Sequence, residues 1–208
     1  MNKLLKISFL IVFAILLIDQ ALKIWIKSTM MIGEEFPVFG HWFFIHFVEN
    51  NGMAFGMELA GEFGKLFLSV FRIVAVCGIG YYLYKLTKKD VPVGLVISIS
   101  MVLAGALGNI IDSAVYGLIF DHSHGQVASF LPEGGGYASF LHGKVVDMFY
   151  FPILRGTYPD WLPLVGGNDF LFFRPVFNFA DSAISVGIFI LLIFYRNYFK
   201  EHESEEKA

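Results

Sequence analysis

The 208-residue chain is 56% hydrophobic, 17% aromatic and only 16% charged, with a mean hydropathy of +0.65. Soluble domains carry about 25% charged residues, so this composition indicates an integral membrane protein, organised as a single membrane domain over residues 1–208. The net charge of −3 does not favour a nucleic-acid partner. The single cysteine, Cys77, excludes a disulfide framework and a thiolate metal site.

The N-terminus has the basic start and apolar stretch of a secretory signal peptide. Lys3 and Lys6 come first, and an apolar run from Ile7 follows. No small-residue cleavage site ends this run, which instead continues through Asp19 and Lys23. The pattern therefore predicts an uncleaved first transmembrane helix.

Four apolar runs are long enough to cross a hydrocarbon core of about 30 Å. They predict an all-α membrane protein with four transmembrane helices, at about 7–26, 66–84, 91–111 and 176–195. Lysines precede the first run and fill the short link between the second and third, whereas residues 28–64 contain no Lys or Arg. The positive-inside rule then predicts that both termini are cytoplasmic and that segments 28–64 and 113–175 are extracytoplasmic.

The first outer segment has strand character at 37–39 and 41–48, where aromatic residues are frequent. Residues 49–52, Glu-Asn-Asn-Gly, predict a hairpin turn after the second strand. We expect a small extracytoplasmic β-sheet at the membrane interface, where aromatic side chains are favoured. The stretch around Asp147 is apolar, β-branched and aromatic, and we expect it to be extended as well.

This orientation brings several acids to one leaflet. Asp19, Asp112 and Asp181 lie toward the outer ends of three runs, and Asp147 lies in the second outer segment. A carboxylate inside a span costs about 2.5–3.5 kcal/mol and is a functional-site hypothesis by default. A pair of carboxylates sharing one proton can hydrolyse peptides, with one as base on water and the other as acid on the carbonyl.

The residues alone leave alternatives open. Asp181 could instead be a first-turn acid that stabilises a helix N-terminus, and Asp147 an exposed turn acid. The orientation argument does not choose among Asp19, Asp112 and Asp147 as the partner of Asp181.

Other polar residues could support such a site or simply hold helices together. Asn109 and Asp112 share one helix face, and Gly105 and Gly108 before them allow close helix approach. Asp19 and Lys23, at i and i+4, could form an internal ion pair. Arg72 lies within the second run and needs a partner that the sequence does not identify.

Rival classes fit less well. The histidines lack a zinc-ligand pattern, and Ser182 lacks a nucleophile motif, so no metal site or serine nucleophile is expected. A proton- or cation-coupled transporter would be expected to show an inverted repeat and acids crossing the midplane. A noncatalytic scaffold gives no reason for the acids to converge.

Five blocks of the sequence together resemble the lipoprotein signal peptidases (signal peptidase II). In the order of that family they are DQxxK at 19–23, ENNGMAFG at 49–56, GALGNIID at 105–112, GKVVDM at 143–148 and FNFADS at 177–182. Each block is weak alone, but five in order over nearly the whole chain are specific.

The resemblance implies an aspartic endopeptidase of the bacterial cytoplasmic (inner) membrane, with its active site at the extracytoplasmic leaflet. Its substrates would be prolipoproteins, cleaved before a diacylglyceryl-modified lipobox cysteine. It would act as a monomer among membrane lipids, without a cofactor. The catalytic aspartates of the family fall on Asp147 and Asp181. Other motif positions would line or support the site: Asp19, Lys23, Asn50, Gly52, Gly105, Gly108, Asn109, Asp112, Asn178 and Ala180.

Two departures from the family pattern stand out. Ser113 replaces the Arg that commonly follows the third-helix aspartate, so Lys144, Arg155 or Arg174 could compensate the charge of Asp112. Segments 113–142 and 152–175 are longer than usual, and they are either an enlarged lid or surface without a catalytic role.

Overall fold

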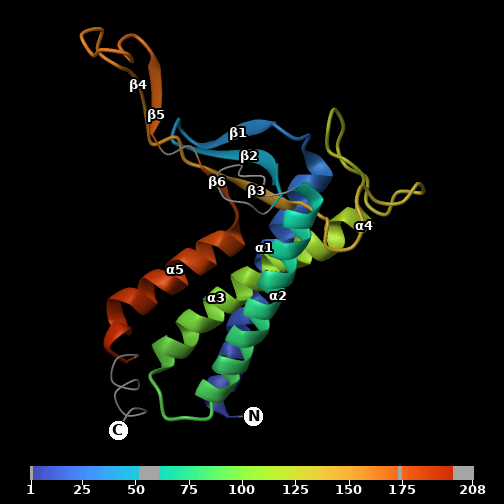
Figure 1. The fold of residues 1–208 in the computed structure, drawn as a ribbon, viewed down its shortest axis with the longest axis vertical. Helices are drawn as coiled ribbons and strands as arrows, with labels where there is room; N and C mark the ends of the chain where they lie inside the picture. Colours follow the sequence, from blue (N-terminus) through green and yellow to red (C-terminus); the bar gives the residue numbers. More distant parts are fainter. Residues whose placement is uncertain (1, 52–60, 173–174, 199–208) are drawn as a thin grey trace.

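Helices fill one end of the molecule, and an antiparallel sheet lies across the other (Figure 1). The computed structural model describes residues 2–51, 61–172 and 175–198, without the side chains of 61–63, 65, 154, 155 and 170–172. The N-terminus and the last turn of α5 lie at the end opposite the sheet (Figure 1).

The helices follow the predicted apolar runs; α1 and α2 extend beyond them, whereas α3 and α5 are slightly shorter. They are α1 (Lys3–Thr29), α2 (Gly61–Leu86), α3 (Val93–Ile111), the π-helical turn η2 (Asp112–Tyr116), α4 (Gly117–Ile119) and α5 (Phe179–Phe194). α3 packs against α1, α2 and α5 and is the central helix. Its neighbours expose large apolar side chains such as Phe13, Phe71 and Phe189, as expected for faces in contact with lipid.

Three helical stretches of the described chain are long and apolar enough to cross a membrane: Lys3–Thr29, Leu66–Leu86 and Val93–Ile119. The fourth, α5, has 16 residues and a length of about 24 Å. The helix begins at Phe179, slightly after the predicted start at about 176, because Val176 and Phe177 form strand β6 and Asn178 is the N-cap. The count of four spans therefore stays a prediction.

The main sheet has four strands in the order β1-β2-β3-β6, all antiparallel. They are β1 (Glu35–Phe39), β2 (Phe43–Asn50), β3 (Val145–Tyr150) and β6 (Val176–Phe177). A separate hairpin, β4 (Leu154–Thr157) and β5 (Asp169–Phe172), projects from this end (Figure 1). The predicted small sheet is thus present, and the all-α label is not confirmed.

The predicted hairpin turn at 49–52 is wrong for Glu49 and Asn50. Both residues belong to β2 and pair with Val146 and Val145 of β3. The turn between β1 and β2 lies instead at 40–42, where Gly40 has a φ of +51° that favours glycine. β3 pairs with β2 on one side and with β6 on the other, so it is a central strand, and Asp147 lies on it.

A hydrophobic cluster joins the sheet to the outer ends of the helices. It combines residues of α1, β2, β3 and the segment after α3: Ile26, Met30, Ile45, Phe47, Tyr116, Phe120, Ala128, Val146 and Met148. The long segment after α3 thus contributes buried side chains to the core beneath the sheet. This cluster fixes β3 against the helix ends.

Candidate active site

The first turn of α5 carries Asp181 in a capping box. The side chain of the N-cap residue Asn178 accepts a hydrogen bond from the backbone N–H of Asp181 at 2.9 Å. In return, a carboxylate oxygen of Asp181 accepts from the backbone N–H of Asn178 at 3.4 Å. The helix-cap alternative is therefore confirmed for Asp181, and one carboxylate oxygen, Oδ1, remains for other partners.

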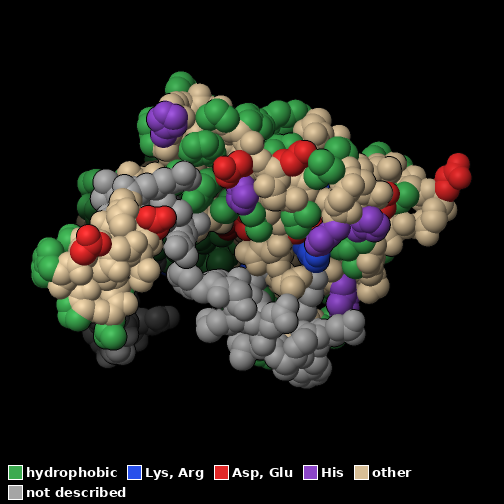
Figure 2. All heavy atoms as spheres, turned by 90° about the horizontal axis from the view of Figure 1, so that it is seen from above, with side chains coloured by type: hydrophobic (Ala, Val, Ile, Leu, Met, Phe, Trp, Pro, Cys, Tyr) green, Lys and Arg blue, Asp and Glu red, His purple; other side chains and the backbone are tan. Residues whose placement is uncertain are grey.

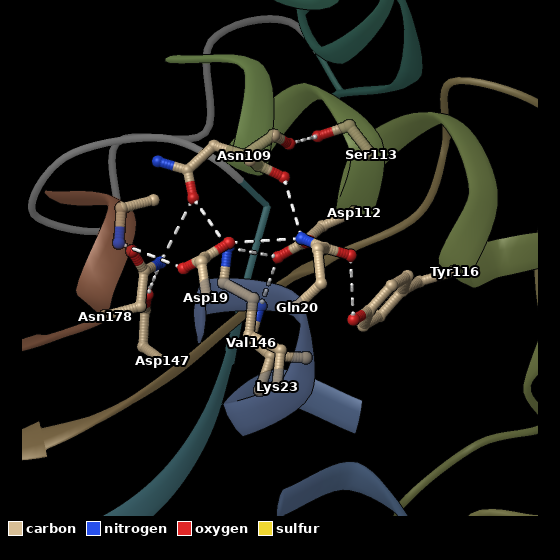
Figure 3. Close-up of polar contacts among 12 residues, drawn as sticks. Asp19, Gln20, Lys23, Asn109, Asp112, Ser113, Tyr116, Val146, Asp147 and Asn178 are labelled. Atoms are coloured by element: carbon tan, nitrogen blue, oxygen red, sulfur yellow. Dashed lines mark hydrogen bonds and ion pairs between the residues drawn. The ribbon is translucent and has the colours of Figure 1, made fainter. Parts of the chain in front are cut away.

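Asp147 of β3 lies beside Asn178 and is only 3% exposed. Asn178 Nδ2 donates to one of its carboxylate oxygens at 2.7 Å, and Asn50 Nδ2 donates to the other at 3.2 Å. Asn178 therefore contacts both aspartates: its side-chain amide donates to Asp147 (Figure 3), and its side-chain oxygen caps the helix turn of Asp181.

Burial, followed by the negative charge of Asp181, raises the pKa of Asp147 to about 7. The hydrogen bonds from Asn50 and Asn178 and the charge of Lys23 act in the opposite direction but do not outweigh these causes. A carboxyl group that keeps its proton near neutral pH can act as a general acid.

A second amide, Asn109 of α3, completes the bridge between the two carboxylates. Its Nδ2 donates to Asp181 Oδ1 at 2.8 Å, and its Oδ1 accepts from Asn178 Nδ2 at 3.1 Å. The same oxygen accepts from Lys23 Nζ at 3.0 Å. Two neutral amides thus connect Asp147 and Asp181, and the nearest lysine contacts an amide.

Lys23 also forms two buried ion pairs, with Asp19 at 2.9 Å and Asp112 at 2.8 Å (Figure 3). All three side chains have no exposed surface. The predicted pair within α1 is therefore confirmed, and Lys23 is also the counter-charge of Asp112. Lys144 is not the counter-charge of Asp112, because its ammonium group pairs with Glu49 at 3.4 Å.

The two acids paired with Lys23 hold the elements that carry the catalytic candidates. Asp19 accepts from the backbone N–H of Ala180 at 2.9 Å, so α1 satisfies a free donor in the first turn of α5. Asp112 accepts from the backbone N–H of Val146 at 3.2 Å, one residue before Asp147. These bonds fix β3 and α5 relative to α1 and α3.

Small residues allow α3 and α5 to approach each other. A Cβ atom on Gly105 would clash with the backbone oxygen of Ala180 and lie 2.7 Å from a side-chain carbon of Ile184. A Cβ atom on Gly108 would lie 2.6 Å from a carboxylate oxygen of Asp19 and 3.2 Å from the Cβ of Ala180. The packing interpretation of these glycines is therefore confirmed, and their role as site-lining residues stays a prediction.

Arg72 of α2 lies within electrostatic reach of the catalytic candidates. It is half-buried, and its charge interacts with Asp181 first and Asp147 second. The sequence supplied no partner for this arginine, because its neighbours come from distant elements.

The other predicted site residues have definite outcomes. Hydrogen bonds and ion pairs join these residues, apart from Gly105, which packs against Ala180, and Gly52. Gly52 lies outside the described residues, as do Arg174 and the side chain of Arg155. Sequence reasoning did not assign roles to Gln20, which donates to Asp112 at 2.9 Å, or to Tyr116, which donates to Gln20 at 3.2 Å. Among the described residues, no group of three or more His, Cys, Asp or Glu is arranged to hold a metal ion.

The fold and the site together define a class, a membrane protein with two carboxylates, one buried and one half-buried, that are bridged by amides. Paired carboxylates of this kind are used by aspartic hydrolases. A family model described as signal peptidase (SPase) II matches residues 11–196.

Curated relatives agree with that match. The "Lipoprotein signal peptidase" of Porphyromonas gingivalis is 52% identical over 191 residues, covering 91% of this chain and 83% of the relative. The protein of the same name from Amoebophilus asiaticus is 34% identical over 179 residues, covering 85% and 72%.

A solved structure described as a bacterial membrane enzyme at 1.9 Å resolution has a TM-score of 0.59 and 28% identity, covering 89% of this chain and 90% of that one. A second, described in the same words at 2.3 Å resolution, also has a TM-score of 0.59, with 25% identity and coverage of 97% and 92%. The chain belongs to the signal peptidase II family.

Proposed function

We propose that this protein is a membrane aspartic endopeptidase that removes signal peptides from prolipoproteins, with Asp147 and Asp181 as its catalytic pair. Membership of the signal peptidase II family supports the activity and the substrate class. The bridge through Asn178, which donates to Asp147 and caps the helix turn of Asp181, carries the assignment of the pair. The scissile bond would precede a diacylglyceryl-modified cysteine.

The raised pKa of Asp147 supports the acid role for Asp147 in this mechanism and leaves the base role to Asp181. Asp181, as the carboxylate, removes a proton from water while the water oxygen bonds to the scissile carbonyl carbon. Asp147 donates its proton to the carbonyl oxygen, which gives a neutral tetrahedral diol. The C–N bond then breaks as Asp181 returns its proton to the leaving nitrogen and one hydroxyl proton of the diol returns to Asp147. The carboxylates activate water by themselves.

The supporting residues would act by position in this scheme. Asn109 and Asn178 hold the two carboxyl groups in register, and Lys23 fixes Asn109 from behind. Asp19 and Asp112 hold the backbone beside each catalytic residue. Positioning of this kind can contribute several kcal/mol to lowering a barrier.

The catalytic pair is tested by replacing Asp147 and Asp181 singly with Asn. Each variant should cleave a diacylglyceryl-modified precursor in detergent micelles at a rate reduced by roughly 10³-fold or more. Asp160→Asn, in an exposed loop, is the matched control and should retain the wild-type rate. Near-normal processing by either active-site variant would refute the assignment.

The proposed topology has four spans, both termini in the cytoplasm and the catalytic pair at the extracytoplasmic leaflet. The distribution of basic residues supports it: Lys3 and Lys6 lie at the start of α1, and Lys88 and Lys89 lie in the link between α2 and α3. Lys and Arg occupy little of the described surface at the sheet end (Figure 2). In a Cys77→Ser background, a membrane-impermeant maleimide should label a cysteine placed at His124 in intact cells, but not one placed at Lys88. The reverse labelling would refute this orientation.

We also expect one membrane domain that acts as a monomer among lipids. The contacts of α3 with α1, α2 and α5 support a single unit. Light scattering of the purified enzyme, corrected for bound detergent, should give a mass near 23.4 kDa. A stable dimer with higher specific activity would contradict the monomer.

A further inference from the structure

A second buried ionic cluster lies beyond the catalytic network, at the outer end of α1. Lys27, with no exposed side-chain surface, forms an ion pair with Glu49 of β2, which is 3% exposed. Ser123, in the segment after α4, accepts from Lys27 Nζ at 2.8 Å and donates to Glu49 at 3.1 Å. These three polar side chains therefore form their ion pair and hydrogen bonds with one another inside the protein.

The segment after α4 encloses this cluster. The ammonium group of Lys27 lies 4.9 Å from the ring centroid of Tyr137 and 5.5 Å from that of Phe120, distances that suit cation–π contacts. Lys144, just before β3, pairs with the second carboxylate oxygen of Glu49 at 3.4 Å, and its backbone N–H donates to the hydroxyl of Tyr137 at 2.7 Å. The end of β2, through Glu49, and the start of β3, through Lys144, are therefore both hydrogen-bonded to the segment after α4.

The charge state of Glu49 fits this enclosure. Burial alone would raise its pKa, but the hydrogen bond from Lys27 and the charges of Lys27 and Lys144 hold the pKa below its ordinary value. A buried ion pair is weak evidence for stability by itself, because well-packed apolar side chains often do as well. The position of this pair in the strand is more informative than its energy.

Glu49 and Asn50 are consecutive residues at the end of β2, so their side chains point to opposite faces of the sheet. Glu49 pairs in register with Val146, on the core face. Asn50 pairs with Val145, and so lies on the same face as Asp147, to which it donates at 3.2 Å. The anchor on one face and the catalytic contact on the other thus belong to adjacent residues.

We propose that Glu49 is a positioning residue for the catalytic pair, fixed by Lys27, Ser123 and Lys144 so that Asn50 keeps its hydrogen bond to Asp147. Segment 120–144 then serves catalysis by holding the end of β2. This inference rests on the proposed function, because it assumes that Asp147 is catalytic.

The test uses the full-length enzyme in micelles and the diacylglyceryl-modified precursor. Glu49→Gln would leave Lys27 buried without a counter-charge, so the main variant is Lys27→Met/Glu49→Leu, which removes both charges. Lys144→Met, at a side chain that is 29% exposed, is a milder second variant. We expect kcat to fall by roughly 10- to 100-fold in the double variant, with KM nearly unchanged. Lys144→Met should show a smaller loss.

Two readouts separate positioning from a general structural role. Loss of the Asn50 hydrogen bond raises the pKa of Asp147, so the alkaline limb of the kcat–pH profile should move to higher pH, as in Asn50→Ala. The other groups that face Asp147 are Asp181, Lys23, Arg72 and Asn178, and these variants leave them in place. Adding Asn50→Ala to the double variant should cost little more, because both changes remove the same contact.

The matched control is Glu35→Gln on the neighbouring strand β1. Glu35 is 45% exposed and lies 3.1 Å from His46, so this change removes a carboxylate from the same sheet without reaching Asn50. It should leave kcat and the pH profile unchanged.

A wild-type kcat and pH limb in the double variant would overturn the inference, as would an effect that adds fully to that of Asn50→Ala. Unfolding of the double variant together with a wild-type profile in Lys144→Met would also overturn it. Normal processing by Asp147→Asn would instead overturn the proposed function, so the two failures are distinguishable.

Discussion

Asp147 should destabilise the protein increasingly as the pH rises, and Asp147→Asn should remove this effect. Its pKa in the folded protein is about 7, against an ordinary value of 3.8. Between these values the unfolded chain has lost the proton and the folded protein still holds it. Folding stability therefore falls as the pH rises, by about 1.4 kcal/mol per pH unit. The full difference is about 4 kcal/mol, present above pH 7 and absent below about pH 4.

The measurable quantity is the difference in stability between Asp147→Asn and the wild type at two pH values. From pH 5 to pH 8 the linkage relation gives an increase of about 3 kcal/mol in favour of the variant. For a chain of this size, that corresponds to a relative gain in Tm of roughly 6–12 °C. Thermal unfolding in detergent, followed by tryptophan fluorescence, measures it at each pH.

A constant offset between the two proteins has a separate cause. An amide at position 147 can accept only one of the two hydrogen bonds that Asn50 and Asn178 donate, which costs stability at every pH. Glu133→Gln, in an exposed loop, corrects both curves for the loss of one negative charge. A Tm difference that stays flat or shrinks from pH 5 to pH 8 would refute the argument that Asp147 is protonated near neutral pH.

Three further changes test other parts of the site. Arg72→Met removes a positive charge near Asp147 and Asp181, the proposed catalytic pair. The pKa of Asp147 should therefore rise and the alkaline limb of the rate profile should move to higher pH; an unchanged limb would count against this. Lys23→Met leaves two buried carboxylates without a cation and should destabilise the protein by about 3–5 kcal/mol. Adding Asp112→Asn should recover part of that loss in thermal unfolding. Gly105→Ala forces α3 away from Ala180 and should cost about 1–3 kcal/mol, with a loss of activity larger than the loss of Tm explains; wild-type kcat would contradict it.

The positions of the helices were predictable because each apolar run extends for several turns. The start of α5 was less so, because Val176 and Phe177 are apolar and continue the run although they pair with β3. Hydropathy does not distinguish a short strand from a helix start. The capping box of Asn178 and Asp181 is visible in the sequence and places the first helical residue at Phe179.

The counter-charge of Asp112 shows what sequence spacing does not reveal. The i, i+4 spacing pairs Lys23 with Asp19, so the sequence predicts a more distant cation, Lys144, Arg155 or Arg174, for Asp112. Only the packing of α1 on α3 shows that one ammonium group serves both acids, at 2.9 and 2.8 Å. This also explains why Ser113 is tolerated: its hydroxyl donates to the backbone oxygen of Asn109 at 3.0 Å, and the adjacent acid needs no second cation.

The placement of charge around the catalytic candidates follows from the chemistry they would perform. A cation bonded directly to both carboxylates would favour ionisation of both, and the acid would lose its proton. Asn109 and Asn178 hold the two groups through neutral amides, so the repulsion between the carboxylates persists and supports the raised pKa of Asp147. Lys23 binds Asn109 and two other acids, so it orders the network from behind the pair. Because an amide separates the Lys23 ammonium group from the pair, this cation lowers the pKa of Asp147 less than a direct ion pair would, and Asp147 can remain an acid beside a base.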